Sequence, residues 1–342
     1  MSASAFGYRA EEEGHQPSRL LEFAKRADSA GFEFVAISDH FHPWFHTGAA
    51  GGFAWTWMSS AAAVLPRMRF GTMVTAPIGR YHPGLVAQAF ATMDEMFPDR
   101  FFLGLGTGEA MNEVPLGLRW PRFEERLQRL RESIEIIRRL WTEDFVTYEG
   151  KYFKLKGANL YTRPRGKVPI YVAALGPKSA ELVGSHADGY AISSPFLGRF
   201  RDTWEIIARS ARKAGRDPST IRKNLELFLS FDEDYDRALR SASKWKPGLI
   251  PGVLGSGLND PRELEREGGV HSDEELSKAW NIATSAEDII KSAMDAMSYG
   301  FEEIQFHSAS PSEEKFIDAC NKEVIPCLRS LDGRGHAREG LA

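Results

Sequence analysis

Apolar and polar positions alternate along the chain in two ways, as short apolar runs and as longer amphipathic stretches. In the amphipathic stretches, apolar residues recur every three or four positions, which predicts helices with one buried face. The longest covers 123–141 after Pro121. Another is predicted near Arg19 to Ala30, after Gln16-Pro17-Ser18, and a third follows His82-Pro83 and runs to Phe97, because proline suits the first turn of a helix. The predicted buried face of the longest helix consists of Leu127, Leu130, Ile134, Ile137 and Leu140.

The short apolar runs predict eight strands between these helices. They cover residues 5–8, 34–37, 69–74, 101–106, 169–173, 189–192, 225–231 and 303–306. Three helices lead through a glycine into the next strand, at Gly31, Gly189 and Gly300. Glycine suits the left-handed turn at a helix C-terminus, so this junction predicts a parallel sheet built from βα units.

Eight such units predict an α/β protein with a (β/α)8 TIM barrel, and an open doubly wound sheet is the alternative. Two regions interrupt the pattern. The region near 148–168 is predicted to be a hairpin or loop insertion. The region near 244–281 is rich in Gly, Pro and charge, and is predicted to be a helical excursion over one barrel end. We therefore expect a single barrel domain over 1–342 with two insertions.

Composition and charge limit the functional classes. The chain has 342 residues, of which 42% are hydrophobic and 26% charged, and this excludes disordered, collagen-like and coiled-coil proteins. Its 43 basic and 47 acidic residues leave a net charge of −4, without the positive field that binds nucleic acid or anionic lipid. No apolar run approaches about 20 residues, and no secretory signal pattern opens the chain. We expect a cytoplasmic protein whose partners include neither nucleic acid nor a membrane.

The cysteines limit the redox chemistry. Cys320 and Cys327 fall in one predicted helix, 316–328, which would place their Cα atoms about 10 Å apart. That distance is too long for a disulfide. No Cys/His cluster has the spacing of zinc ligands, so we expect no metal site. A redox enzyme of this composition would need an organic cofactor.

Polar residues follow four of the predicted strands, at ends that a barrel gathers on its C-terminal face, where barrel active sites lie. They are Ser38-Asp39-His40, Gly106-Thr107-Gly108-Glu109, Ser193-Ser194 and His307-Ser308. Histidine exchanges protons near neutral pH, and a neighbouring carboxylate can orient it. His40 beside Asp39 is therefore a candidate acid or base, with Trp44 in the loop just beyond. A hydrogen-bonded structural histidine is the alternative.

Two glycine-containing turns are candidate ligand loops. The turn at 104–109 is neither GxGxxG nor a Walker loop, but its glycines allow backbone amides to approach an anionic or flat ligand closely. The turn at 175–179 is a better phosphate candidate, because Pro177 would lie in the first helical turn and leave N–H groups free. A plain connecting loop is the alternative for each.

Three stretches together resemble a known enzyme family. They are 38–44 (SDHFHPW), 80–83 with 87–93 (RYHP and AQAFATM), and 106–113 (GTGEAMNE). They are similar to the deazaflavin-dependent branch of the bacterial luciferase-like superfamily. The most similar members are the F420-dependent glucose-6-phosphate dehydrogenases and the F420-dependent secondary alcohol dehydrogenases. The similarity runs in order over nearly the whole chain, and only the last dozen residues fall outside it.

The resemblance implies a (β/α)8 barrel, usually a homodimer, that binds coenzyme F420 at the C-terminal face. The family's cofactor contacts fall here on Asp39, Thr107, Gly108, Asn112, Leu175, Gly176, Lys178 and Ser179. Met73-Val74 matches a bulge, often with a non-prolyl cis peptide, that backs the deazaflavin ring. One family contact, a threonine hydroxyl, falls on Ala76, which has no hydroxyl to offer.

The resemblance also implies catalytic roles. His40 takes the hydroxyl proton as hydride leaves the same carbon for C5 of the deazaflavin. Glu109 resembles the acid that serves the N1 edge of the cofactor, Trp44 helps to hold the developing charge, and Glu13 lines the same pocket. An FMN-dependent monooxygenase and a cofactor-storing protein of the same fold are alternatives, although storage would need no acid or base.

The substrate prediction depends on three missing cations. The family's sugar-phosphate enzymes hold the phosphate with two lysines and an arginine, which fall here on Phe196, Gly255 and Ala279. A desolvated phosphate without cationic partners is unfavourable. We therefore expect an uncharged, secondary alcohol near Ser193 and Phe196, with a ketone and reduced F420 as products. The alternative is a sugar-6-phosphate dehydrogenase with a relocated phosphate site. The cations available to it are Arg199, Arg201, Lys244 and Lys246.

Overall fold

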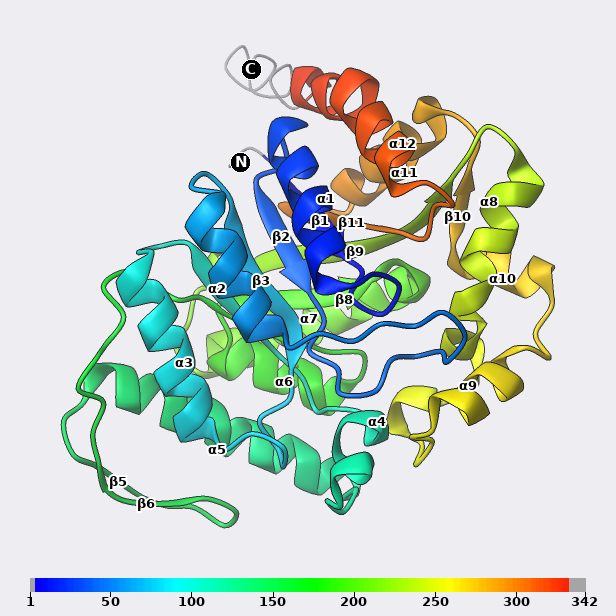
Figure 1. The fold of residues 1–342 in the computed structure, drawn as a ribbon. Helices are drawn as coiled ribbons and strands as arrows, with labels where there is room; N and C mark the ends of the chain where they lie inside the picture. The colour runs from blue at the N-terminus through cyan, green and yellow to red at the C-terminus, as the bar shows by residue number, and fades with distance from the viewer. Residues whose placement is uncertain (1–3, 332–342) are drawn as a thin grey trace.

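Eight parallel strands form a closed barrel in the computed structural model, which describes residues 4–331 (Figure 1). The strands are β1 (Ala5–Ala10), β2 (Phe34–Ile37), β3 (Arg69–Thr75), β4 (Phe101–Leu105), β7 (Ile170–Ala173), β8 (Gly189–Ser193), β9 (Arg222–Phe231) and β11 (Glu303–Ser308). They pair in the order β9-β11-β1-β2-β3-β4-β7-β8, and β8 pairs with β9 to close the ring. The predicted (β/α)8 barrel is confirmed, and the open sheet is excluded.

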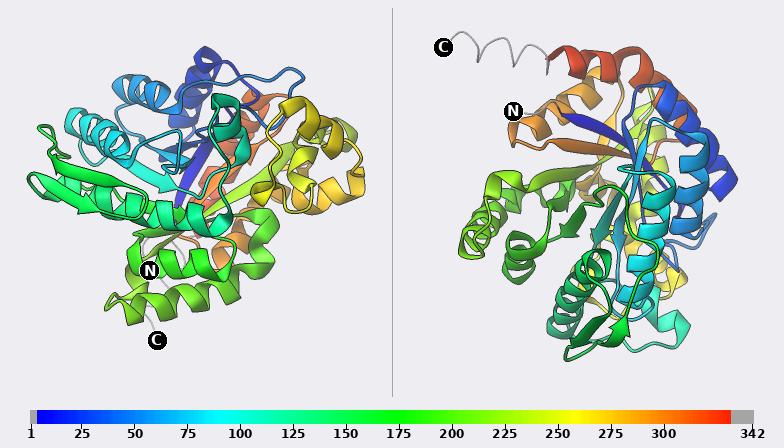
Figure 2. Two further views of the ribbon diagram at one scale, coloured as in Figure 1. Left: turned by 90° about the horizontal axis from the view of Figure 1, so that it is seen from below. Right: turned by 90° about the vertical axis from the view of Figure 1, so that its left-hand side faces the viewer.

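Helices surround the ring of strands, as the left view of Figure 2 shows. The α-helices are α1 (Pro17–Ser29), α2 (Ala54–Val64), α3 (Pro83–Met96), α4 (Ala110–Glu113), α5 (Phe123–Thr142), α6 (Pro177–His186), α7 (Phe200–Lys213), α8 (Tyr235–Ala242), α9 (Pro261–Gly268), α10 (Asp273–Ala279), α11 (Ala286–Ser298) and α12 (Glu313–Ala319). The helix predicted after Pro121 is α5, and all five residues of its predicted apolar face are buried. Periodicity therefore identified both the helix and its inward side.

Aromatic rings fill the middle of the barrel, and each occupies the space beside a glycine of a neighbouring strand. A Cβ added at Gly71 would lie 2.1 Å from the ring of Phe102, and one added at Gly189 would lie 2.2 Å from the ring of Tyr171. Phe102 packs edge-on against Phe34 at 5.9 Å and against Tyr171 at 5.6 Å between ring centroids. The small residue on one strand thus makes room for the large one on the next.

Two of the three glycine junctions have the predicted conformation. Gly31 and Gly300 follow α1 and α11 with φ of 90° and 81°, as a left-handed helix end requires. The prediction is wrong at Gly189, which is the first residue of β8. Glycine is needed there because the Tyr171 ring occupies the place of a side chain.

Two excursions leave the barrel on different sides of Figure 1. Between α5 and β7 the antiparallel hairpin β5 (Val146–Glu149) and β6 (Lys154–Ala158) lies at the lower left. Between α8 and β11 the chain forms α9, α10 and the short strand β10 (Asn281–Ala283), which lie at the right. This second segment joins the loop after β2 in an apolar cluster, here called the roof cluster. Its members are Trp44, Phe45, Met111, Ala242, Trp245, Leu264, Leu276, Trp280 and Ala309.

Both cysteines are free thiols, as their helical spacing predicts. Cys320 is buried at the start of a π-helical turn, Cys320–Val324, and Cys327 is partly exposed. Among residues 4–331, no helix is long and apolar enough to span a membrane.

Candidate active site

His40 lies at the centre of a cluster of carboxyl groups at the C-terminal end of the barrel. It follows β2, while Glu13 follows β1 and Glu109 follows β4. His40 Nδ1 is 2.7 Å from Glu13 Oε1, and His40 Nε2 is 3.1 Å from Glu109 Oε2. Glu13 is buried, whereas Glu109 is 20% exposed, so the open side of the imidazole is the side of Nε2. The barrel thus brings three residues from three strand ends together, as expected for a proton-transfer site.

The electrostatics of this cluster hold a proton firmly. Burial alone would lower the pKa of His40, but Glu109 and Glu13 on its two sides raise that pKa well above its ordinary value. Burial would raise the pKa of Glu13, yet the hydrogen bond and charge of His40, with the charge of Arg9, lower it to about 2. Glu13 is therefore ionised at neutral pH and forms a charge-assisted bond with the imidazole.

Asp39 has a different role from the one that its position beside His40 predicts. Its Oδ2 accepts a hydrogen bond from Thr75 Oγ1 at 2.7 Å, and its Oδ1 accepts from Tyr81 at 2.9 Å. Arg80 Nη2 lies 3.1 Å from the same Oδ1. The carboxylate therefore ties the end of β2 to β3 and the loop after it, and Glu13, not Asp39, orients the imidazole.

Trp44 stands at the edge of the cluster and belongs to the roof cluster. Its ring packs edge-on near His40, with 6.4 Å between ring centroids, and only 8% of the residue is exposed. Trp245 and Trp280, from the segment between α8 and β11, add apolar surface beside it. The side of the site away from the strands is thus walled by hydrophobic groups.

The glycine-rich turn after β4 packs directly on the end of β3. The peptide bond Met73-Val74 is cis, as the resemblance predicts, and the pairing of β3 with β4 shifts register between Thr72 and Thr75. A Cβ at Gly106 would lie 2.5 Å from Val74 Cγ2. Any larger residue there would push this turn away from the bulge.

Two further predicted contacts lie around this turn. A Cβ at Gly108 would lie 3.0 Å from Ala76 Cβ, so the alanine in place of the family's threonine packs against the turn. Thr107 is half-buried beside it. Asn112 is buried, and its Oδ1 accepts the N–H of Phe41 at 2.7 Å, which joins the loops after β4 and β2.

The predicted phosphate loop begins α6. Gly176 is the N-cap and Pro177 follows it, while Ser179 Oγ donates to the Gly176 carbonyl at 2.9 Å. Apart from its chain neighbours, no atom of residues 4–331 lies within 4 Å of the position that a Cβ would take on Gly176, so this helix start is open. Leu175 is partly buried against the main core. The Lys178 ammonium is exposed and lies 2.9 Å from Glu124 Oε1.

The two predicted substrate residues lie at and beyond the end of β8. Ser193 Oγ donates to Glu226 Oε2 at 2.8 Å, and Glu226 Oε1 accepts from Arg9 Nε at 2.9 Å. His307 Nδ1 also lies 3.0 Å from that oxygen. Phe196 is partly buried against the main core. Ser193 is thus part of a buried polar group next to the His40 cluster.

Sequence reasoning missed Glu12, Arg9 and Glu226, which are buried or nearly so around the same strand ends. Glu12 Oε1 accepts the main-chain N–H of His40 at 3.1 Å. One carboxyl oxygen of Glu12, one of Glu13 and one ring nitrogen of His40 lie within 4.8 Å of one another. Within residues 4–331, this is the only group of three His, Cys, Asp or Glu side chains that could together hold a metal ion. The available signal was three consecutive glutamates, residues 11–13, directly after an apolar strand.

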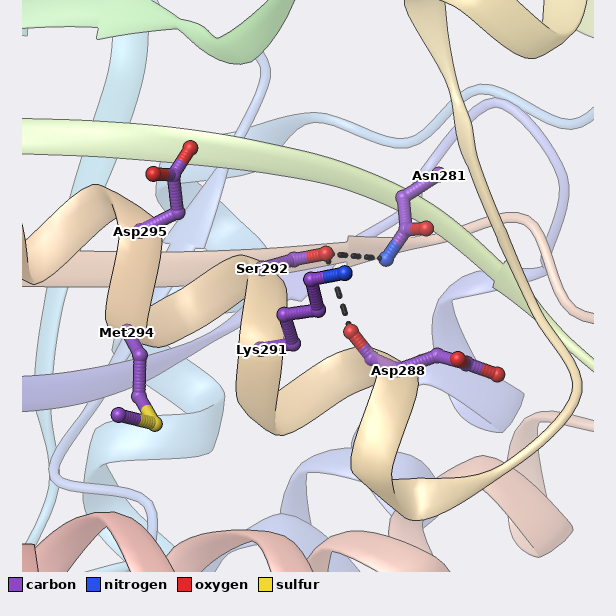
Figure 3. Close-up of a pocket in the computed structure, with 6 residues that line it drawn as sticks. All are labelled: Asn281, Asp288, Lys291, Ser292, Met294 and Asp295. Atoms are coloured by element: carbon purple, nitrogen blue, oxygen red, sulfur yellow. Dashed lines mark hydrogen bonds between the residues drawn. The ribbon is translucent and has the colours of Figure 1, made fainter.

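A surface depression of about 610 Å³ lies elsewhere, on α11 (Figure 3). Two hydrogen bonds join residues that line it: Asn281 Nδ2 donates to Ser292 Oγ at 2.7 Å, and Ser292 Oγ donates to the Asp288 carbonyl at 3.0 Å. None of the predicted site residues lines it. The chemistry therefore lies at the strand ends, not in this depression.

Known proteins match the chain over most of its length. The family model for luciferase-like monooxygenases matches residues 2–296. The F420-dependent glucose-6-phosphate dehydrogenase of Mycolicibacterium gilvum is 35% identical over 97% of this chain and 100% of that protein. The enzyme of the same name from Nakamurella multipartita is 37% identical over 96% and 98%. The structure of an F420-dependent secondary alcohol dehydrogenase in complex with an F420–acetone adduct aligns with a TM-score of 0.91. It is 35% identical, and 95% of this chain and 99% of that one are covered.

Proposed function

The chain belongs to the luciferase-like monooxygenase family, and on that premise we propose that it oxidises an uncharged secondary alcohol to a ketone with coenzyme F420 as the acceptor. It is an F420-dependent dehydrogenase that acts on CH–OH donors. The observation that carries the choice of an uncharged alcohol is the apolar roof cluster beside His40, together with uncharged residues at the three phosphate-binding positions, Phe196, Gly255 and Ala279.

The strand ends fit both parts of this cofactor, a flat deazaflavin and an anionic tail with a phosphate. The turn at Gly106 and the bulge at Met73-Val74 form a closely packed backing with little side-chain bulk. The open start of α6 at Gly176 presents main-chain N–H groups and the positive end of the helix dipole, which suits the phosphate. The remaining residues that would hold the cofactor are Asp39, Thr107, Gly108, Asn112, Leu175, Lys178 and Ser179.

When bound, F420 supplies a hydride acceptor at C5 of the deazaflavin. The protein's own task is to remove the hydroxyl proton. Glu13 is ionised and accepts the proton on Nδ1, so His40 offers Nε2 as the base, beside Glu109, once the pH exceeds its raised pKa and the imidazole is neutral. Trp44 packs edge-on near this imidazole and adds apolar surface beside it.

The charges around the site support an uncharged substrate. Lys244 Nζ lies 2.6 Å from Glu11 Oε1, and Lys246 Nζ lies 2.9 Å from a carboxylate at the start of α10. Arg199 and Arg201 are exposed on the surface. A relocated phosphate site would have to break one of these ion pairs or recruit an arginine from solvent. Sugar-6-phosphate oxidation is nevertheless the second candidate, since the two curated relatives above bear that name.

Steady-state assays of F420 reduction with isopropanol and with glucose-6-phosphate test the choice. We expect saturable turnover of isopropanol and a higher kcat/KM for it, and saturable turnover of the sugar phosphate alone would overturn the proposal. A triple variant, Phe196→Lys with Gly255→Lys and Ala279→Arg, restores the family's three cations. It is expected to gain turnover of glucose-6-phosphate and to lose turnover of isopropanol.

A further inference from the structure

The carboxyl group of Glu12 contacts the main chain of His40 and takes no part in the chemistry described above. Glu12 is 1% exposed, and its Oε1 accepts the main-chain N–H of His40 at 3.1 Å. Its Oε2 has no hydrogen-bond partner in the described part of the chain, and the same is true of Glu13 Oε2. Two adjacent buried carboxyl groups thus each hold His40 with one oxygen and leave the other oxygen free.

The two free oxygens are complementary if only one of the carboxyl groups is ionised. The charged and titratable groups that face Glu12 are Glu13, His40, Arg9 and Tyr81. Burial and then the negative charge of Glu13 raise the pKa of Glu12 well above its ordinary value, against the opposing charges of His40 and Arg9. Two carboxylates this close do not both ionise readily. A neutral Glu12 has an O–H to donate, and an ionised Glu13 has an acceptor to offer.

We propose that Glu12 is a positioning residue, which holds the His40 main chain with Oε1 and donates a hydrogen bond from Oε2 to Glu13, directly or through one water. One carboxyl oxygen of Glu12, one of Glu13 and one ring nitrogen of His40 lie within 4.8 Å of one another, a separation that one water can bridge. Glu13 is then fixed from behind while it holds His40 Nδ1, and Nε2 keeps its direction toward the substrate. The inference rests on the proposed role of His40 as the base.

Two substitutions separate this role from simple packing. Glu12→Gln keeps the shape and neutrality of the carboxyl group, because the amide oxygen can accept from His40 and the amide nitrogen can donate to Glu13. Glu12→Ala removes both bonds. We expect kcat to fall about 10- to 100-fold in Glu12→Ala with little change in KM, as for other supporting residues behind an active-site ligand. Glu12→Gln should restore kcat to within about threefold of the wild type.

Full kcat in Glu12→Ala, or a loss in Glu12→Gln as large as in Glu12→Ala, would overturn the proposal. The first result would mean that the bonds do not matter. The second would mean that an ionised carboxylate is required. Thermal melting of both variants controls for misfolding, because a purely structural role would lower the melting temperature without lowering kcat of the folded enzyme.

Spectroscopy of the cofactor-free protein tests the protonation state without any assay of turnover. The His40 pKa, from NMR of ¹⁵N-labelled histidine, should be the same in Glu12→Gln and in the wild type. A lower His40 pKa in Glu12→Gln would show that an ionised group had been removed, which contradicts the proposal. Infrared difference spectra should show loss of a protonated-carboxyl band in Glu12→Gln at neutral pH. Glu313→Gln is the positive control for this band. Burial raises the pKa of Glu313 to about 8, so this variant should also lose a protonated-carboxyl band at neutral pH.

These spectroscopic results do not depend on which alcohol is oxidised. If isopropanol proves to be the wrong substrate, the titration and the infrared band still report on Glu12. Failure of the substrate proposal and failure of the Glu12 proposal are therefore distinguishable.

Discussion

The two ends of the barrel interior both bury charged side chains, but they balance the charges differently. At the N-terminal end, the buried carboxylate of Glu303 accepts hydrogen bonds from Arg69 at 3.2 Å and from Arg222 at 3.0 Å. One anion thus faces two cations. Gln305 Oε1, a buried atom at this end with no hydrogen-bond partner in the described part of the chain, belongs to an uncharged group.

At the C-terminal end, the ratio is reversed. Three carboxyl groups, Glu12, Glu13 and Glu109, stand around His40, and Arg9 is the nearby guanidinium. In the described part of the chain, Glu12 Oε2 and Glu13 Oε2 have no hydrogen-bond partner. Crowding like charges in a buried site costs folding free energy, and it also shifts pKa values away from their ordinary range. This difference supports the proposal that the N-terminal end of the barrel contributes to stability and the C-terminal end carries proton transfer.

The largest expected effect comes from removing the base at the C-terminal end. His40→Ala should lower kcat by about 10²- to 10⁴-fold, because the hydroxyl proton then has no acceptor. Steady-state F420 reduction measures the loss, and tryptophan-fluorescence titration with F420 is the control for cofactor binding. Near-normal turnover with the cofactor bound would contradict the role of His40 as the base. It would also contradict proton transfer at the C-terminal end of the barrel.

The second-largest effect is expected at the N-terminal end of the barrel, and only on the stability of the fold. Glu303→Ala leaves Arg69 and Arg222 without their shared anion, and should lower the free energy of unfolding by about 2–4 kcal/mol. Urea denaturation measures this change. Glu149→Ala is the control, because Glu149 pairs with Lys154 on the surface, where both side chains are more than 70% exposed and a loss of about 0–1 kcal/mol is expected. A large fall in kcat of folded Glu303→Ala would show that the two ends are not separate in function.

The pH dependence of alcohol oxidation should reflect the raised pKa of His40. Alcohol oxidation should rise with pH, with a midpoint above the ordinary histidine pKa of 6.5, because only neutral His40 accepts a proton. Glu109→Gln should lower that midpoint, since Glu109 is the stronger of the two charges that raise it. Profiles of kcat/KM against pH measure both, and an unchanged midpoint in Glu109→Gln would contradict the contact at Nε2.

The same shifts predict how stability depends on pH. The pairing of His40 stabilises the fold fully below pH 6.5, and this contribution is lost as the pH rises through the raised folded pKa. The contribution of Glu13 is present above pH 4.5 and is lost as the pH falls toward about 2. Melting temperatures of the wild type and of Glu13→Gln across this range measure the second contribution, and parallel curves for the two proteins below pH 4.5 would contradict it.

The smallest effect is expected between the two ends, among the aromatic rings of Phe34, Phe102 and Tyr171 in the middle of the barrel. Gly71→Ala puts a Cβ within 2.1 Å of the Phe102 ring and should destabilise the fold by about 1–3 kcal/mol, with kcat little changed. Adding Phe102→Leu should recover part of the loss. Gly51→Ala, where no atom lies within 4 Å of the new Cβ, is the control and should shift the melting temperature little. Equal destabilisation in both alanine variants would mean that crowding is not the cause.

Much of the fold could be predicted because its signals are local. The apolar runs identified all eight barrel strands, and the spacing of Leu127 to Leu140 identified the inward face of α5. Even so, a local signal can be right for the wrong reason. Gly189 marks the start of a strand as predicted, but it is required by the ring of Tyr171, a residue of the neighbouring strand.

For the site, the sequence by itself determined which chemical groups stand at the strand ends, among them His40, Glu109 and the start of α6. Only the tertiary structure decided how they pair. In the folded protein the imidazole of His40 bonds to Glu13, whereas its sequence neighbour Asp39 bonds to Thr75. Glu12 bonds to the main-chain N–H of His40. These partners are 27 or more residues apart along the chain. Such contacts depend on strand order, register and barrel closure, which bring distant side chains within hydrogen-bonding distance and which no local pattern specifies.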